Sequence, residues 1–96
     1  MNYEIKNKFI KAKINSFGAE LNSLQRVDTN LEYMWQGNPQ YWNRYSPVLF
    51  PIVGRLKDDS YFYKNKKYRM TQHGFARDNE FWLTKQTDNH WEFKLE

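Results

Sequence analysis

The sequence predicts an all-β fold, and three observations support this. Hydrophobic and polar residues alternate with a period of two, as in Ile10–Ile14, where Ile, Ala and Ile are separated by two lysines. Turn-forming residues interrupt these runs at short intervals, a spacing typical of a β-sandwich or barrel. Only residues 40–45 suggest a helix, and there we expect a single brief turn.

The alternation predicts individual strands in chain order. Residues 10–14 form a strand with one wet face, and residues 31–35 alternate Leu, Tyr and Trp with Glu and Met. Residues 61–63 and 67–70 flank Lys64-Asn65-Lys66, which is the outline of a β-hairpin. The loops between these runs are rich in Gly, Asn, Asp and Pro.

The last strand predicted is residues 91–95, in which Trp, Phe and Leu alternate with charged residues. This alternation continues to Glu96 with no turn after it. We therefore expect a strand whose partner comes next in a longer protein. The edge of such a strand tends to pair with another chain, so self-association through it is expected.

Composition limits the classes of function. Fifteen Lys and Arg against eleven Asp and Glu give a formal charge of +4, spread along the chain, which favours a solvated surface over nucleic-acid binding. There are no cysteines, and no zinc or calcium motif is present. No apolar run approaches the roughly 20 residues of a membrane span, and no secretory signal is evident. We expect a cytoplasmic protein without metal, membrane or nucleic-acid partner, in which the four tryptophans fill a core.

Two motifs indicate a ligand site. Arg55 closes the run Leu-Phe-Pro-Ile-Val-Gly-Arg, and Gln72, His73 and Arg77 belong to the run Thr-Gln-His-Gly-Phe-Ala-Arg. Burying such polar groups among apolar residues costs several kcal/mol unless each finds a partner. A packed core would not favour this mixture, whereas a site for a polar, hydroxyl-rich ligand would.

Two of these residues have obvious chemistry and also a plain alternative. A histidine such as His73 is the commonest general acid or base near neutral pH, but it can equally be a hydrogen-bonded residue of a turn. The guanidinium fork of Arg55 suits hydroxyls, carboxylates and phosphates. Alternatively, Arg55 forms a surface ion pair with Asp58 or Asp59.

The other two residues are weaker signals. Gln72 offers both a donor and an acceptor, which suits sugar hydroxyls. Arg77 could bind a ligand, or it could pair locally with Asp78 or Glu80. From the residues alone both interpretations stay open.

Several segments resemble the N-terminal part of the aldose 1-epimerase family. Their order over nearly the whole chain makes the match specific, whereas any single segment would be only suggestive. The resemblance is strongest to the mutarotase-like proteins associated with lactose operons, and the hexose-6-phosphate epimerases are more distant. The segments are Gly18–Leu21, Tyr33–Trp35, Trp42–Arg55, Tyr68 and His73–Asp78.

The resemblance implies a large antiparallel β-sandwich (the galactose mutarotase-like supersandwich) whose concave face holds a hexose or hexose phosphate. Residues 1–96 would be the N-terminal part of this single domain. The implied reaction interconverts α and β anomers without metal or cofactor. A non-catalytic sugar-binding or regulatory protein on the same fold is the alternative.

The resemblance also implies roles for the candidate residues. Arg55 corresponds to a sugar-binding arginine and His73 to the first active-site histidine. Gln72 and Arg77 correspond to substrate-binding residues of the phosphosugar branch. The family's main acid, a second histidine, and its glutamate base belong to downstream sequence, and His90 is too close to His73 to replace that acid. We therefore expect this chain alone to be inactive.

Overall fold

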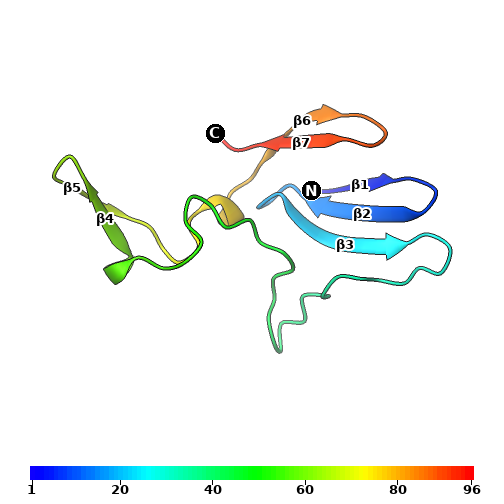
Figure 1. The fold of residues 1–96 in the computed structure, drawn as a ribbon, viewed down its shortest axis with the longest axis horizontal. Helices are drawn as coiled ribbons and strands as arrows, with labels where there is room; N and C mark the ends of the chain where they lie inside the picture. The colour runs from blue at the N-terminus through cyan, green and yellow to red at the C-terminus, as the bar shows by residue number, and fades with distance from the viewer.

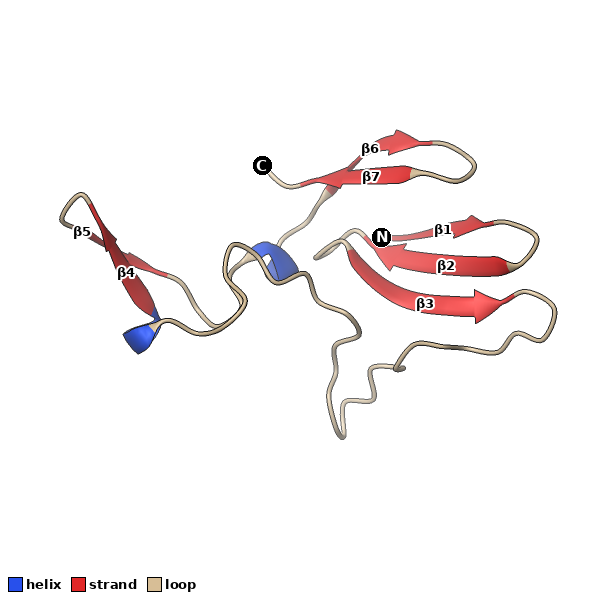
Figure 2. Cartoon of the chain, viewed as in Figure 1, coloured by secondary structure: helices blue, strands red, loops and turns tan.

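The computed structural model describes residues 1–96 and confirms the all-β prediction (Figure 1). Three antiparallel sheets are present, with strand orders β1-β2-β3, β4-β5 and β6-β7. The only helical segments are two short 3₁₀ turns, η1 (Lys57–Asp59) and η2 (Ala76–Asp78) (Figure 2). The strands are β1 (Asn2–Lys6), β2 (Ile10–Asn15), β3 (Glu20–Arg26), β4 (Ser60–Tyr63), β5 (Lys66–Arg69), β6 (Trp82–Gln86) and β7 (Trp91–Lys94).

Local sequence explains how the first sheet begins. The side-chain oxygen of Asn7 accepts hydrogen bonds from the backbone N–H groups of Phe9 (2.8 Å) and Ile10 (2.9 Å). This Asx turn reverses the chain and sets the register in which Lys6 faces Lys11. Strand β3 continues the meander, with a register shift in β2 after Lys13.

Three sequence predictions agree closely with the observed strands. Residues 10–14 lie in β2, and residues 91–95 include β7. The predicted hairpin is β4-β5, and Lys64 and Asn65 take the positive φ angles (49° and 63°) that a tight hairpin turn requires.

One sequence prediction is wrong. Residues 31–35 form only an isolated bridge, between Glu32 and Gln25 of β3. There the Glu32 carboxylate accepts hydrogen bonds from the Leu24 N–H (3.1 Å) and the Ser23 hydroxyl (3.2 Å), so side-chain bonds replace part of a strand ladder. The brief turn expected at residues 40–45 is present at the start of this range, where the N–H groups of Tyr41 (3.0 Å) and Trp42 (2.9 Å) donate to the Asn38 carbonyl.

Few residues of the chain are buried, and much of its surface is exposed. Only Ser16, Gly18, Gly74 and Ala76 are buried. The accessible surface of 7461 Å² exceeds by roughly 1,500 Å² the area expected for a compact protein of 11.8 kDa. The radius of gyration, 16.4 Å, is likewise larger than the ~12.5 Å typical of this length.

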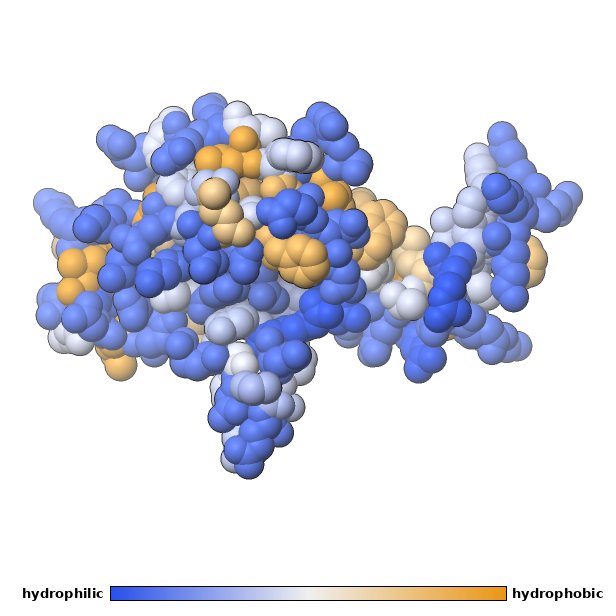
Figure 3. Space-filling view, turned by 180° about the vertical axis from the view of Figure 1, so that it is seen from behind, coloured by the Kyte–Doolittle hydropathy of each residue, from blue (hydrophilic) through white to orange (hydrophobic).

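The aromatic residues therefore do not form one core. Tyr3 of β1 contacts Trp91 and Phe93 of β7, with ring centroids 5.3 and 5.6 Å away, which joins the sheets that lie side by side in Figure 1. The expectation of a tryptophan core is wrong for the other three tryptophans, because the chain covers each of them only in part. Hydrophobic residues instead appear on the surface around the centre of the molecule, while the β4-β5 hairpin stands clear of it (Figure 3). The exposed tryptophans are Trp35 (43%), Trp42 (47%) and Trp82 (64%).

Candidate functional site

The two polar motifs lie against each other although eighteen residues separate Arg55 from His73. The His73 N–H donates to the Gly54 carbonyl (2.9 Å), and the Ala76 N–H donates to the Phe50 carbonyl (3.1 Å). Between these bonds Gly74 takes φ +74°, and a Cβ there would overlap the Phe50 carbonyl group. Glycine is thus required for this close backbone approach.

The segment that carries His73 is also attached to the first sheet. Gly18 (φ +77°) donates its N–H to the Asn79 carbonyl (2.7 Å), and a Cβ at Gly18 would lie 2.8 Å from the Arg77 carbonyl oxygen. The Phe81 N–H donates to the Ser16 carbonyl (2.9 Å), and the Ser16 hydroxyl donates to the Glu80 carboxylate. The four buried residues therefore lie where the segment that carries His73 joins its neighbours, and this junction positions the site. They are Ser16, Gly18, Gly74 and Ala76.

His73 occupies a turn with an unusual backbone. Its φ is +65°, and the Gly74 N–H closes the turn on the Thr71 carbonyl (3.0 Å). Non-glycine residues with positive φ are uncommon, although histidine is among those enriched there. The Nδ1 of His73 donates to the Val53 carbonyl, since a carbonyl oxygen only accepts. This bond fixes the ring and leaves Nε2 as the nitrogen available for a ligand.

The structure brings together three of the four predicted site residues. Gln72, His73 and Arg77 line one cleft of about 460 Å³. Its wall is completed by Trp42, Pro47 and Leu49. The cleft therefore combines an amide, an imidazole and a guanidinium with the half-exposed ring of Trp42, a mixture suited to a polar ligand that has apolar faces.

Arg77 is held at the edge of this cleft by one hydrogen bond and one long ion pair. Its Nη2 donates to the Gln72 carbonyl (3.0 Å), and its Nε lies 3.8 Å from an Asp78 carboxylate oxygen. The same carboxylate forms a shorter ion pair with Arg44 (2.8 Å). The Nε of Arg77 is buried without a hydrogen-bond partner, so any ligand in the cleft would meet the terminal N–H groups of this guanidinium instead.

Arg55 does not line the cleft. Its Nε and Nη2 donate to the two carboxylate oxygens of Asp59, at 2.8 and 3.2 Å. This hydrogen-bonded contact raises the pKa of the Arg55 guanidinium and lowers the pKa of the Asp59 carboxyl. The structure thus contains the ion pair that was the alternative for Arg55, and the sugar-binding role of this residue stays a prediction.

Sequence reasoning did not include Trp42 among the site residues. The available signal was its position as the first residue of the Trp42–Arg55 segment, which ends at a predicted site residue. His90 lies elsewhere, in an exposed contact with Glu92 (2.9 Å). No group of three or more His, Asp or Glu side chains is arranged to ligate a metal ion. The structure also contains no helix with the length and hydropathy needed to cross a membrane.

Comparisons with known proteins cover the whole chain. Residues 1–96 match the family model for aldose 1-epimerase. The plasmid and chromosomal LacX proteins of Lactococcus lactis subsp. lactis are each 35% identical over 100 residues, which cover 99% of this chain and 33% of theirs. The chain thus spans about a third of the length of these curated relatives.

Solved structures agree with this result. The galactose mutarotase related enzyme of Lactobacillus acidophilus is 49% identical with a TM-score of 0.96, over 99% of this chain and 32% of that one. A galactose mutarotase-like protein of Lactobacillus casei is 43% identical with a TM-score of 0.86, over 92% of this chain and 30% of that one. The fold is galactose mutarotase-like, as the sequence resemblance implied, and the chain belongs to the aldose 1-epimerase family.

Proposed function

We propose that the cleft of Gln72, His73 and Arg77 binds the sugar of an aldose 1-epimerase, which interconverts the α and β anomers of a hexose or hexose phosphate. The observation that supports this most is the convergence of these three side chains on one cleft beside Trp42. Family membership adds the reaction class, an isomerase, for the intact protein. Residues 1–96 would form one part of its single domain.

The proposed chemistry breaks and reforms one bond. A base removes the proton of the C1 hydroxyl while an acid protonates the ring oxygen, and the C1–ring oxygen bond opens to an aldehyde. Rotation about the C1–C2 bond and ring closure give the other anomer. In this scheme His73 presents Nε2 to the reacting oxygen, because its Nδ1 is held by Val53. Proton transfers of this kind contribute about 10²–10⁴-fold each.

The remaining roles concern substrate binding. Gln72 would exchange hydrogen bonds with sugar hydroxyls, and Arg77 would bind a phosphate through the terminal N–H groups that its bond to the Gln72 carbonyl does not use. Arg55 uses two of its N–H groups on Asp59, so three of the five in a guanidinium remain for a sugar. A cytoplasmic location and self-association of the isolated chain stay predictions.

A second candidate is sugar binding without catalysis on the same fold. It is favoured by one observation: His73 makes a backbone bond to Val53 of the kind that a structural turn histidine makes. Binding and catalysis are therefore tested separately.

The test of binding uses the two histidines as reporters. Titration with galactose or galactose 6-phosphate should shift the imidazole NMR signals of His73 and leave those of His90 unchanged. The His73→Ala variant identifies the signal. If neither histidine responds, or if both respond equally, the cleft is not a sugar site.

A further inference from the structure

One carboxylate, that of Asp78, lies between two arginines. The Arg44 Nη2 atom is 2.8 Å from one oxygen of this carboxylate, and the Arg77 Nε atom is 3.8 Å from the other oxygen. No other carboxylate of the structure is shared by two arginines in this way. The first contact is a hydrogen-bonded ion pair, whereas the second is too long for a hydrogen bond.

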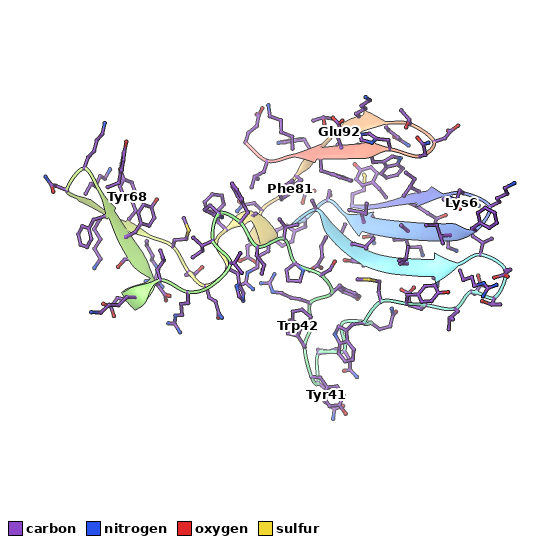
Figure 4. The ribbon with its side chains drawn as sticks, in the orientation of Figure 1. Lys6, Tyr41, Trp42, Tyr68, Phe81 and Glu92 are labelled. Atoms are coloured by element: carbon purple, nitrogen blue, oxygen red, sulfur yellow. The ribbon has the colours of Figure 1, made fainter.

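The two arginines come from different parts of the chain. Arg77 and Asp78 both belong to η2, shortly after His73. Figure 4 shows Trp42 on the loop that follows β3, and Arg44 lies two residues further along this loop. Arg44 is 34 residues from Asp78, so the bond between them is a tertiary contact. It joins the loop to the segment that carries the candidate site.

Arg77 lacks a bond that Asp78 could provide. The Arg77 Nε is buried and has no hydrogen-bond partner, which is an unfavourable state for a donor. If the nearer Asp78 oxygen moved by about 1 Å, it would come within hydrogen-bond distance of this Nε. The bond to Arg44 holds the other oxygen of the same carboxylate and opposes this movement.

The position of Arg77 makes this competition relevant to ligand binding. Its side chain lines the cleft of Gln72 and His73 (the sugar cleft), and it also lines a separate cleft of about 290 Å³. Arg44 lines only the second of these clefts. A bidentate pair with Asp78 would use two N–H groups of Arg77 and would neutralise its positive charge at the sugar cleft.

We propose that Arg44 is a positioning residue, which holds Asp78 away from Arg77 and so keeps the Arg77 guanidinium available to an anionic group, such as the phosphate of a hexose phosphate. Because Arg44 does not line the sugar cleft, its effect passes through Asp78. Arg44 thereby favours hexose phosphates over free hexoses, since a neutral sugar gains less from the charge of Arg77. The identity of the ligand rests on the proposed function, whereas the competition for Asp78 does not.

The test measures binding of galactose 6-phosphate and of galactose by isothermal titration calorimetry. Arg44→Gln should weaken binding of galactose 6-phosphate by at least about fivefold, a typical size for coupling between separate groups, and should leave galactose binding nearly unchanged. Asp78→Asn should bind galactose 6-phosphate at least as tightly as the unaltered chain. The double variant Arg44→Gln/Asp78→Asn should bind it as Asp78→Asn does, because an asparagine carries no charge to compete for Arg77.

The matched control is Arg26→Gln. It removes one positive charge from another exposed arginine–aspartate pair, with the same separation of 2.8 Å, and should not alter the binding of either ligand. A double variant that stays weak would show that Arg44 meets the phosphate itself. Equal losses of galactose and galactose 6-phosphate in Arg44→Gln would show that Arg44 only supports the fold. Either result overturns the proposal.

A measurement without sugar separates this inference from the proposed function. The NMR signal of the Arg77 Nε–Hε group is identified by its loss in Arg77→Lys. In Arg44→Gln its proton should move downfield, because it enters a hydrogen bond to Asp78, and in the double variant it should return. An unmoved signal would overturn the inference whether or not a sugar binds. A signal that moves in a chain that binds neither ligand would uphold the positioning of Asp78 by Arg44 and reject the proposed function.

Discussion

Replacing Gly74 with alanine should disrupt the candidate site more than adding a methyl group at any other position would. Gly74 has φ +74°, and its added Cβ would overlap the Phe50 carbonyl oxygen and lie 2.6 Å from that carbonyl carbon and 2.7 Å from the Pro51 nitrogen. All three contacts are with backbone atoms, which cannot move aside as a flexible side chain does. The substitution must therefore push the His73 turn away from the 50–54 segment.

The magnitude has two parts. Placing an alanine in the left-handed region costs roughly 1–2 kcal/mol. Overpacking against a fixed neighbour typically costs a further ~1–3 kcal/mol. The sum, about 2–5 kcal/mol, is a large share of the ~5–15 kcal/mol that stabilises an ordinary domain. Displacement of the turn would also lengthen the bonds from His73 to Gly54 and from Ala76 to Phe50.

The chain provides a matched control one residue before Arg55. A Cβ at Gly54 would meet no atom within 4 Å, and Gly54 has no positive φ, so Gly54→Ala should change stability by less than ~0.5 kcal/mol. Urea unfolding followed by tryptophan fluorescence compares the two variants. If Gly74→Ala unfolded at the same urea concentration as Gly54→Ala, the reasoning from backbone contact would be refuted.

Four other measurements test the remaining conclusions. The Arg55 guanidinium lowers the pKa of Asp59, so the ion pair stabilises the fold above the ordinary carboxyl pKa of about 4, and this stabilisation is lost as the pH falls through the lower folded-state pKa. Asp59→Asn should therefore lower the stability of the fold at pH 7 and lower it less at pH 3. An equal loss of stability at both pH values would contradict the prediction. Arg77→Ala should weaken binding of galactose 6-phosphate by on the order of 1.5–3 kcal/mol and that of galactose by less, whereas equal losses would make Arg77 structural. In polarimetry with fresh α-glucose and α-galactose the isolated chain should give the buffer rate; a faster rate that His73→Ala abolishes would show that 96 residues suffice. Sedimentation should find the isolated chain associated, because β7 is hydrogen-bonded only to β6, and a monomer at all concentrations would exclude pairing through that strand.

The strands that the sequence predicted are those in which alternation coincides with a strong turn signal. β4-β5 is the best example, because Lys64-Asn65 supplies the residues for a tight turn between two aromatic runs. β3 lacked such a signal, since Asn22 and Ser23 interrupt its apolar pattern. Residues 31–35 had the alternation without a complete ladder, because the Glu32 carboxylate accepts the Leu24 N–H and backbone bonds join the segments only on either side of it, at Leu31 and Tyr33. The period-two alternation of hydrophobic and polar residues does not by itself identify the partner of a strand.

The site shows the same limit at closer range. Gln72, His73 and Arg77 come together because six residues and a glycine turn connect them, which sequence reasoning can follow. Arg55 could bind a ligand or pair with Asp58 or Asp59, and Asp59 is the residue that it binds here. The sequence contains both options but not the orientation that decides between them.

Residues 47–50 separate the cleft of Gln72, His73 and Arg77 from a second, mostly apolar cleft of about 540 Å³. Pro47 and Leu49 line the first cleft, whereas Val48 and Phe50 line the apolar one. A wall between two clefts keeps its position best when both of its faces are packed, and Phe50 is 57% exposed. If the first cleft binds sugar as proposed, a chimera in which this sequence replaces the matching third of the Lactobacillus acidophilus relative should bind galactose more tightly than the isolated chain. Equal galactose affinity of the two chains would show that this wall needs no packing on its apolar face.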